Sequence, residues 1–208
     1  MSKVYDTIII GAGIAGATTA YTLTKKGQNV LVLDKVGIAS GGSGAAGAFV
    51  SPKIGKGSSL QTLTNASFSF AKDFYLSTSP NFFHQTGVIR IPKDEDDAQK
   101  FSSYETFNDN KYETYTQEQL QKLGINSHFE SFNFPEAGIC DAKEVCAYLL
   151  LDIDVLKYEV KESTQVGGLW HVGPYRAKNI VLATGYESDL ADLRYMGIKG
   201  TWGTRGDF

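Results

Sequence analysis

The sequence predicts an α/β fold whose core is a buried, mostly parallel β-sheet, and three observations carry that prediction. Val4 to Ile10 is a short apolar run rich in β-branched residues, as in a strand covered on both faces. A helical stretch, Ile14 to Lys26, and a second buried strand, Val30 to Leu33, follow at once and complete a β-α-β unit. A late apolar run, Ala177 to Ala183, then returns to the same sheet.

Between the second and the late strand the pattern changes. Lys35 to Pro52 is a loop of mostly glycine, serine and alanine, whose side chains are too small for a core element. Ser58 to Leu76 places apolar residues near one helical face, and Phe82 to Ile91 is strand-like until a proline ends it. The charged stretch from Lys93 to Leu123 fits two exposed helices and a connector. These segments predict an inserted α+β region.

The elements that precede the late strand have their own signals. Asp141-Ala-Lys-Glu144 has the form of a capping box with an acidic N-cap, and predicts a helix to about Leu151. Two further strands are expected over residues 154–160 and 168–172. With the late strand they form a three-strand pattern that brings the chain back to the sheet.

Composition and charge exclude several classes of protein. With 208 residues, 42% hydrophobic and 21% charged, the chain is neither disordered nor a coiled coil. Its 20 basic and 23 acidic residues give a net charge of -3, so no overall basic field attracts nucleic acid. No apolar run approaches the roughly 20 residues of a membrane helix. Because the polar N-terminus lacks the features of a signal peptide, we expect a cytoplasmic location.

The cysteines and the acidic run predict neither a disulfide framework nor a metal site. Cys140 and Cys146, the two cysteines, are spaced unlike a redox pair or half of a zinc site, so we expect reduced, buried thiols. The four acids from Asp94 to Asp97 would splay to different sides of one helix. We interpret them as a solvated face.

One motif carries chemistry. Gly11-Ala-Gly13-Ile-Ala-Gly16 fits the G-x-G-x-x-G fingerprint, follows a predicted strand and opens a predicted helix. Asp34 comes 18 residues after Gly16, at the end of the next strand, where a carboxylate can accept hydrogen bonds from a ribose diol. Gly11 permits the tight turn, Gly13 the approach of a pyrophosphate, and Gly16 the close packing of the helix on the sheet. The motif predicts binding of a dinucleotide with an unphosphorylated ribose, FAD or NAD.

Two features bear on the choice between FAD and NAD. The loop from Ala39 to Gly47 supplies backbone donors and the Ser40 and Ser43 hydroxyls directly after the ribose carboxylate, and such a loop can wrap a pyrophosphate and reach a flavin edge. The late strand ends in Ala183-Thr-Gly185, where small residues let it pass beside a cofactor. The β-α-β unit alone also permits an NAD-dependent dehydrogenase.

On these residues the sequence resembles the FAD-dependent oxidoreductases of the D-amino acid oxidase (DAO) superfamily. The resemblance rests on Asp6-Thr-Ile-Ile-Ile-Gly-Ala-Gly-Ile-Ala-Gly16, Val32-Leu-Asp34, Ala39-Ser-Gly-Gly-Ser-Gly44, Gly168-Leu-Trp-His-Val172 and Ile180-Val-Leu-Ala-Thr-Gly185. A narrower resemblance, carried by residues 47–52, 68–75 and 84–88, is to the flavin domain of the bifunctional tRNA 5-methylaminomethyl-2-thiouridine biosynthesis proteins, whose loop is shorter.

The resemblance implies a glutathione-reductase-like (Rossmann-type) FAD-binding domain with an inserted α+β substrate domain. Residues 1–52 would be the first part of the FAD-binding domain and residues 53–138 the substrate or cap region. Residues 139–208 would complete the FAD-binding part and begin a return to the substrate domain. The chain ends at Phe208, before the C-terminal segment that normally provides the substrate-carboxylate arginine and donors near the flavin. We therefore expect a C-terminally truncated version of this fold.

The resemblance also implies which residues meet the cofactor. The three motif glycines and residues 40–44 would hold the diphosphate, Asp34 the ribose where many relatives have Glu, and Ala46 to Ala48 would lie near the isoalloxazine. Val160 would meet adenine through its backbone, and Ala183 to Gly185 would make a second diphosphate-side contact. The cofactor-binding residues that we expect are Gly11, Ala12, Gly13, Ile14, Ala15, Gly16, Asp34, Lys35, Ala39, Ser40, Gly41, Gly42, Ser43, Gly44, Ala46, Gly47, Ala48, Val160, Ala183, Thr184 and Gly185.

The sequence assigns no catalytic residue. His84 and His171 lie in apolar strand-like runs and His128 in a polar turn, where structural roles are commoner. Arg90 and Arg205 are candidates for anion recognition, although an exposed strand arginine explains Arg90 as well. The aromatic residues from 68 to 83 follow a packing period and suggest a core, not a base-stacking platform.

Three hypotheses about function remain. The first is a DAO-type oxidoreductase that oxidises the C–N bond of a glycine-like primary or secondary amine, the carboxymethylaminomethyl group of a tRNA wobble uridine among them. The second is a non-catalytic or incomplete FAD-binding fragment. The third is an NAD-dependent dehydrogenase. The partners implied by the first are a small amine or a modified tRNA, with no membrane and no metal.

Overall fold

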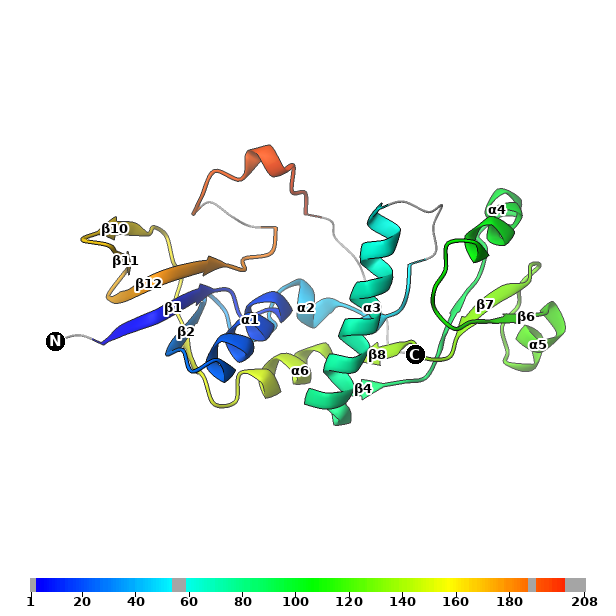
Figure 1. Ribbon diagram of the computed structural model, residues 1–208, viewed down its shortest axis with the longest axis horizontal. Coiled ribbons are helices and arrows are strands. Elements are labelled where there is room, and N and C mark those ends of the chain that lie inside the picture. The colour runs from blue at the N-terminus through cyan, green and yellow to red at the C-terminus, as the bar shows by residue number, and fades with distance from the viewer. Residues whose placement is uncertain (1–2, 54–58, 187–189, 201–208) are drawn as a thin grey trace. The chain divides into compact units, whose positions relative to one another are not determined.

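The computed structural model describes residues 3–53, 59–186 and 190–200, and these residues form two compact units. Unit 1 joins Met1–Gly47 to Asp141–Phe208, and unit 2 is Ala48–Cys140. Both ends of unit 2 therefore connect to unit 1, as expected for a region inserted into another fold (Figure 1).

Unit 1 is built on a six-stranded sheet of order β10-β11-β12-β1-β2-β9. Its parallel part consists of β12 (Tyr175–Leu182), β1 (Val4–Ile10), β2 (Val30–Asp34) and β9 (Asp154–Lys157). An antiparallel edge is added by β10 (Thr164–Val166) and β11 (Leu169–Val172). The late strand thus pairs with the first one, which confirms that the chain returns to its starting sheet.

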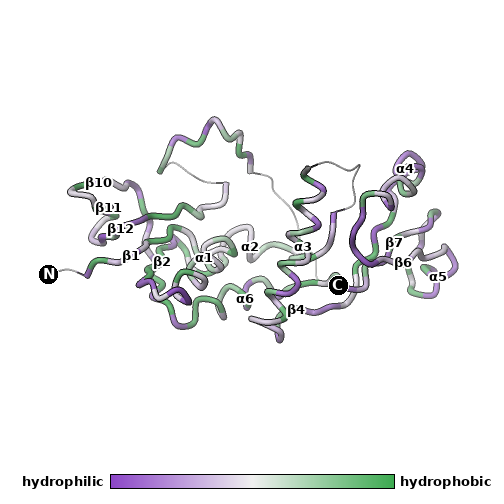
Figure 2. Tube along the Cα trace, viewed as in Figure 1, coloured by the Kyte–Doolittle hydropathy of each residue, from purple (hydrophilic) through white to green (hydrophobic). Residues whose placement is uncertain are grey.

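The centre of this sheet is buried because β1 and β2 are apolar on both faces. Ile8 pairs with Leu31 on one side and with Ile180 on the other, and both Ile8 and Leu31 are fully buried. Figure 2 shows the hydrophobic colour along β1 and β2. Helix α1 (Ile14–Lys25) buries Gly16, Ala17 and Ala20, small residues that allow close packing, and it lies against α6 (Ala142–Leu149).

Unit 2 contains two three-stranded antiparallel sheets. One has the order β3 (Phe49–Val50), β8 (Gly138–Cys140) and β4 (Phe83–His84); the other has the order β5 (Val88–Arg90), β7 (Ser131–Phe134) and β6 (Glu113–Tyr115). Its helices are α3 (Ser59–Thr78), α4 (Glu95–Glu105) and α5 (Gln117–Lys122). Short 3-10 turns occur at Pro80–Phe82 in this unit and at Arg194–Met196 in unit 1.

The core of unit 2 is aromatic. Phe101 of α4 stacks on Phe132 of β7 with ring centroids 4.6 Å apart, and Phe68 of α3 belongs to the same buried cluster. The prediction that the aromatics from 68 to 83 form a core is confirmed for Phe68 and Phe83. It is wrong for Phe70, which is 72% exposed.

Three predictions of local structure are wrong, each for a physical reason. Phe82 to Ile91 is not one strand, because Gly87 adopts φ +77° and separates β4 from β5, which belong to different sheets. Asp141 is the N-cap of α6, but its side chain accepts no capping hydrogen bond. The strand that begins at Asp154 ends at Lys157, so Val160 lies beyond it.

Other elements were not predicted. The glycine-rich loop contains the short helix α2 (Gly42–Ala45), and the charged stretch contains β6. Neither β7 nor β8 was expected. A complete capping box does form, but at Thr116 and Gln119 of α5. Cys146 is buried as expected, whereas Cys140 is only half-buried.

Candidate functional site

The β1–α1 turn folds so tightly that two of its glycines, Gly11 and Gly16, cannot be replaced without displacing backbone. Gly11 has φ +109°, and a Cβ there would lie 2.3 Å from the Ala183 carbonyl oxygen. A Cβ on Gly16 would lie 1.9 Å from the Gly11 carbonyl oxygen, so the helix meets the strand end directly. The roles expected for the first and third glycines, a tight turn and close packing, are therefore confirmed.

The carboxyl ends of three neighbouring strands meet at this turn. Ala183, directly after β12, donates its N–H to Ile10 O at 2.8 Å, and Gly11 N–H donates to Leu33 O at 2.8 Å. The structure thus brings Ala183 and Thr184, of the predicted segment Ala183 to Gly185, beside the turn. Because the carboxyl edge is where parallel α/β sheets bind ligands, the site lies where such a fold places one.

The Asp34 carboxylate is half-buried and held by backbone on both oxygens. Oδ2 accepts the N–H of Ala12 at 2.8 Å. Oδ1 accepts the N–H groups of Val36 at 2.9 Å and Gly37 at 2.8 Å, and the Ser40 hydroxyl lies 3.5 Å from the same oxygen. A carboxylate offers about four acceptor positions, so Oδ2 keeps one for an outside donor.

The glycine-rich loop is attached to the turn at two further points. Ala39 N–H donates to Ala12 O at 3.0 Å, and Ile14 N–H, at the start of α1, donates to Ser43 Oγ at 2.9 Å. A hydroxyl that accepts in this way still has its own hydrogen to donate. Sequence reasoning missed these attachments, since nothing in the pattern distinguishes Ser43 from Ser40.

The start of α1 suits an anionic group. Gly13 is the N-cap and makes no side-chain capping hydrogen bond, and the first turn carries no acidic residue. Ile14 N–H is already bonded to Ser43 Oγ, so the other N–H groups of the first turn and the helix dipole favour negative charge here. A Cβ at Gly41, Gly42 or Gly185 would meet nothing within 4 Å, so this backbone is open to a ligand.

Most residues expected to meet the cofactor lie in this part of unit 1. Two of them, Val160 and Ala48, lie outside the β1–α1 turn, the loop of residues 39–47 and the end of β12. Val160 lies outside the strands and packs against the unit 1 core cluster, whose members include Ile10 and Leu33. Ala48 begins unit 2 with φ +48°, and its carbonyl accepts the N–H of Cys140 at 3.0 Å.

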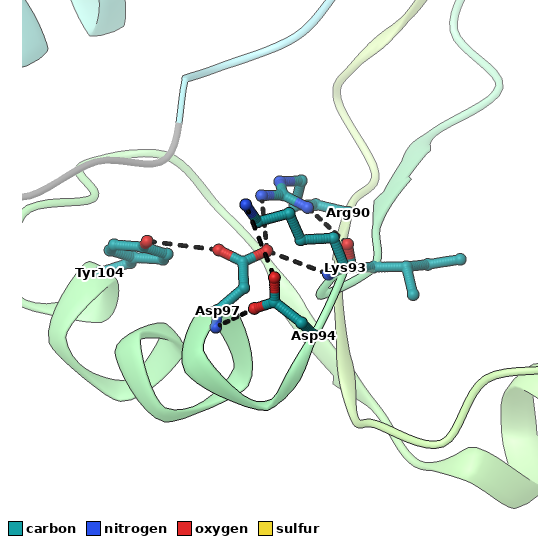
Figure 3. A network of polar contacts seen from close by, with 6 residues as sticks. Arg90, Lys93, Asp94, Asp97 and Tyr104 are labelled. Carbon is teal, nitrogen blue, oxygen red and sulfur yellow. Dashed lines mark hydrogen bonds and ion pairs between the residues drawn. The ribbon is translucent and has the colours of Figure 1, made fainter.

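Arg90, a candidate for anion recognition, is engaged inside unit 2. Its guanidinium donates to Asp97 Oδ2 at 3.0 Å (Figure 3). It also lies over the Phe101 ring, 5.5 Å from the centroid. Asp97 also accepts the Lys93 N–H at 3.1 Å. Burial would raise the pKa of Asp97, but the Lys93 amide and the charge of Arg90 outweigh it and hold that pKa below its usual value. Arg90 therefore fastens β5 to α4.

The two strand histidines that the sequence singled out lie in elements other than the β1–α1 turn and the glycine-rich loop. His84 lies in β4 and His171 in β11, while Arg205 lies outside the described residues. The described residues bring no three His, Cys, Asp or Glu side chains together as metal ligands. Among the same residues, no helix combines the length and hydrophobicity that crossing a bilayer requires.

The fold and the site together define a dinucleotide-binding α/β domain with an insertion. Residues 6–201 match the family model described as FAD dependent oxidoreductase, DAO. This match covers most of the chain, and the chain belongs to that family of FAD-dependent oxidoreductases. The expected fold, cofactor class and family are thereby confirmed.

Among named proteins, the chain is similar in sequence to MnmC proteins. The chain is 27% identical over 93% of its length to the tRNA 5-methylaminomethyl-2-thiouridine biosynthesis bifunctional protein MnmC of Marinobacter nauticus, and covers 34% of that protein. It is 38% identical over 95 residues to the MnmC of Maricaulis maris, which is 45% of this chain and 16% of that one. The chain thus spans about a third or less of these relatives.

A solved structure shows the same fold. The crystal structure of glycine oxidase from Geobacillus kaustophilus matches with a TM-score of 0.70 at 18% identity, over 89% of this chain and 56% of that one. This likeness confirms the α/β fold and extends to about half of that enzyme.

Proposed function

We propose that this chain forms the FAD-binding part of a DAO-type oxidoreductase that acts on the C–N bond of a glycine-like primary or secondary amine. The observation that carries the proposal is the join between the β1–α1 turn and the glycine-rich loop at the carboxyl edge of the sheet. Family membership supports FAD as the cofactor, and the names of the MnmC relatives support an amine attached to a modified tRNA uridine as the substrate.

The residues present fit a dinucleotide. The turn is too tight for a side chain at Gly11 or Gly16, the α1 N-terminus favours a diphosphate, and the Ser43 hydroxyl has a hydrogen to donate. Asp34 keeps one acceptor position for a ribose hydroxyl. Bound FAD would supply acceptance of a hydride from the carbon beside the amine. The work of this chain is to hold and orient the cofactor.

In this proposal unit 1 binds FAD and unit 2 is the substrate region. The segment from Ala46 to Ala48 connects them and would lie toward the isoalloxazine. Val160 would meet the adenine side through its backbone. Lys35 follows the ribose carboxylate and would contact the same end of the cofactor.

A second candidate is that the 208-residue chain binds FAD without oxidising amines by itself. Two observations favour it. The chain covers 56% of the glycine oxidase that it resembles, and Arg90 is held by Asp97 inside unit 2. Substrate turnover would then need groups that the described residues do not supply.

One series of measurements separates these functions. The purified protein is reconstituted with FAD, and the affinity is measured from the quenching of flavin fluorescence, with NADH as the competing ligand. Glycine, N-methylglycine and 5-carboxymethylaminomethyluridine are then added anaerobically. Bleaching of the flavin by any of them supports the oxidoreductase, and preference for the nucleoside supports the tRNA-linked substrate. FAD binding without bleaching supports the second candidate. Saturation by NADH without affinity for FAD would refute both.

A matched pair of variants tests the location of the site. Ser43→Ala removes a hydroxyl that joins the loop to α1, and we expect FAD affinity to fall about tenfold. Ser77→Ala, in which the hydroxyl lost bonds only carbonyls of its own helix α3, should leave the affinity unchanged. Equal affinities of the two variants would contradict the assignment.

A further inference from the structure

The Asp34 carboxylate already accepts several hydrogen bonds from the protein itself, beyond the contact with ribose that the proposed site gives it. Its four donors come from two segments that are far apart in the sequence: Ala12 in the β1–α1 turn, and Val36, Gly37 and Ser40 in the glycine-rich loop. The two oxygens divide them, since Oδ2 accepts from the turn and Oδ1 from the loop. One side chain therefore connects both backbone segments that would surround a diphosphate.

The short side chain explains this arrangement. Asp34 is the last residue of β2, and Tyr158 N–H donates to its carbonyl oxygen at 2.8 Å, so its backbone is fixed in the sheet. A carboxylate one methylene from a fixed backbone stays close to the neighbouring amides. The longer side chain of glutamate would carry the carboxylate past these N–H groups, toward the ligand side.

The loop has a conformation that needs such support. Ala39 adopts φ +51°, a left-handed conformation that costs free energy for a residue with a Cβ. Gly44 then lies so close to Ala39 that a Cβ would come within 2.0 Å of the Ala39 carbonyl oxygen. The bonds from Val36 and Gly37 to Asp34 fix the start of the loop directly before this strained residue.

We propose that Asp34 is a positioning residue that clamps the glycine-rich loop to the β1–α1 turn, in addition to any contact with ribose. The clamp fixes the backbone of the turn and of the loop relative to each other, and these are the two segments that would face the phosphates. Cofactor binding therefore does not have to order the loop. This inference rests on the proposed FAD site, but its main readouts do not require bound FAD.

Trypsin provides a local test, because Lys35 lies between Asp34 and the first clamped amide. Cleavage of the Lys35–Val36 bond is followed by mass spectrometry in FAD-free protein, together with hydrogen exchange of the amides of Ala12, Val36 and Gly37. The variants are Asp34→Asn and Asp34→Glu. Asp6→Asn is the control, since Asp6 accepts an Asn29 N–H and pairs with Lys178 at the opposite end of the sheet.

We expect both Asp34 variants to cleave after Lys35 and to exchange these amides about tenfold to a hundredfold faster than the wild type, as the loss of hydrogen bonds to a charged acceptor implies. FAD affinity should fall at least about tenfold in Asp34→Asn. Asp34→Glu, which keeps a carboxylate for ribose, should lose less affinity and yet show the fast cleavage. Asp6→Asn should change neither readout.

Several outcomes would overturn the inference. Weaker FAD binding with wild-type cleavage and exchange would make Asp34 a ribose ligand only. Faster cleavage with unchanged FAD affinity would show that the clamp does not serve the cofactor. If circular dichroism shows that Asp34→Asn does not fold, Asp34→Glu decides by the same criteria. If the wild type binds no FAD, the proposed function fails, and cleavage and exchange still decide whether Asp34 holds the two segments.

Discussion

Replacing Gly44 or Gly42 with alanine tests the packing of the glycine-rich loop, because the same substitution meets different surroundings two residues apart. Both glycines lie in α2. A Cβ on Gly44 would lie 2.0 Å from the Ala39 carbonyl oxygen, whereas a Cβ on Gly42 would meet nothing within 4 Å. Neither residue has a positive φ, so backbone strain does not separate them.

The two substitutions should change the free energy of unfolding differently. To reach even a tight Cβ contact of 3.0 Å, Ala39 would have to withdraw by about 1 Å, and overpacking of this kind costs about 1–3 kcal/mol. Alanine is favoured over glycine in a helix by up to about 1 kcal/mol. Gly44→Ala should therefore lose about 1–3 kcal/mol, and Gly42→Ala should be unchanged or slightly more stable.

Urea unfolding of the FAD-free variants, followed by tryptophan fluorescence, measures this difference in unit 1. Trp170 lies in β11, and residues 48–140 contain no tryptophan, so the signal does not come from unit 2. If Gly44→Ala is as stable as the wild type, or if Gly42→Ala loses as much as Gly44→Ala, the close contact between the loop and Ala39 does not exist.

Three further predictions concern side chains outside the loop. Because the folded pKa of Asp97 is lowered, the stability that it contributes should be present above the unfolded value of about 3.8 and lost as the pH falls through the folded pKa. Asp97→Asn should flatten this acid limb of thermal unfolding, while a limb that the exposed Asp96→Asn flattens equally would refute the assignment. Burial raises the pKa of Cys146 from 9.0 to about 11, so its thiolate fraction is about a hundredfold below that of an ordinary thiol. A thiol reagent at pH 8 should label Cys140 first, and equal rates in folded protein would contradict this burial. Phe132→Ala should cost about 3–5 kcal/mol and the exposed Phe70→Ala less than about 1 kcal/mol by chemical unfolding followed by circular dichroism, whereas similar costs would argue against the aromatic core.

The sequence predicted best those elements whose local residue pattern fits only one kind of secondary structure. The run from Val4 to Ile10 matches β1 residue for residue, because three consecutive isoleucines and a following glycine leave no other structure. The β-α-β unit was equally clear, since the G-x-G-x-x-G spacing fixes where the strand ends and the helix begins.

Predictions failed where long-range contacts decide the structure. β7 and β8 pair with strands far away in the sequence, so no local pattern announces them. The positive φ of Gly87, which lies between β4 and β5, is visible only in the structure. In the site, the motif predicted the turn and Asp34. It could not predict that Asp34 bonds both segments or that Ser43 meets Ile14, because these depend on the path of the loop.

The central claim is that the joined turn and loop of unit 1 bind FAD. The visible absorption spectrum of the purified, FAD-reconstituted protein, followed by mass measurement of the released cofactor, tests it most directly. We predict flavin absorption that remains with the protein after gel filtration and a released compound with the mass of FAD. A colourless protein that cannot be reconstituted with FAD would contradict the account.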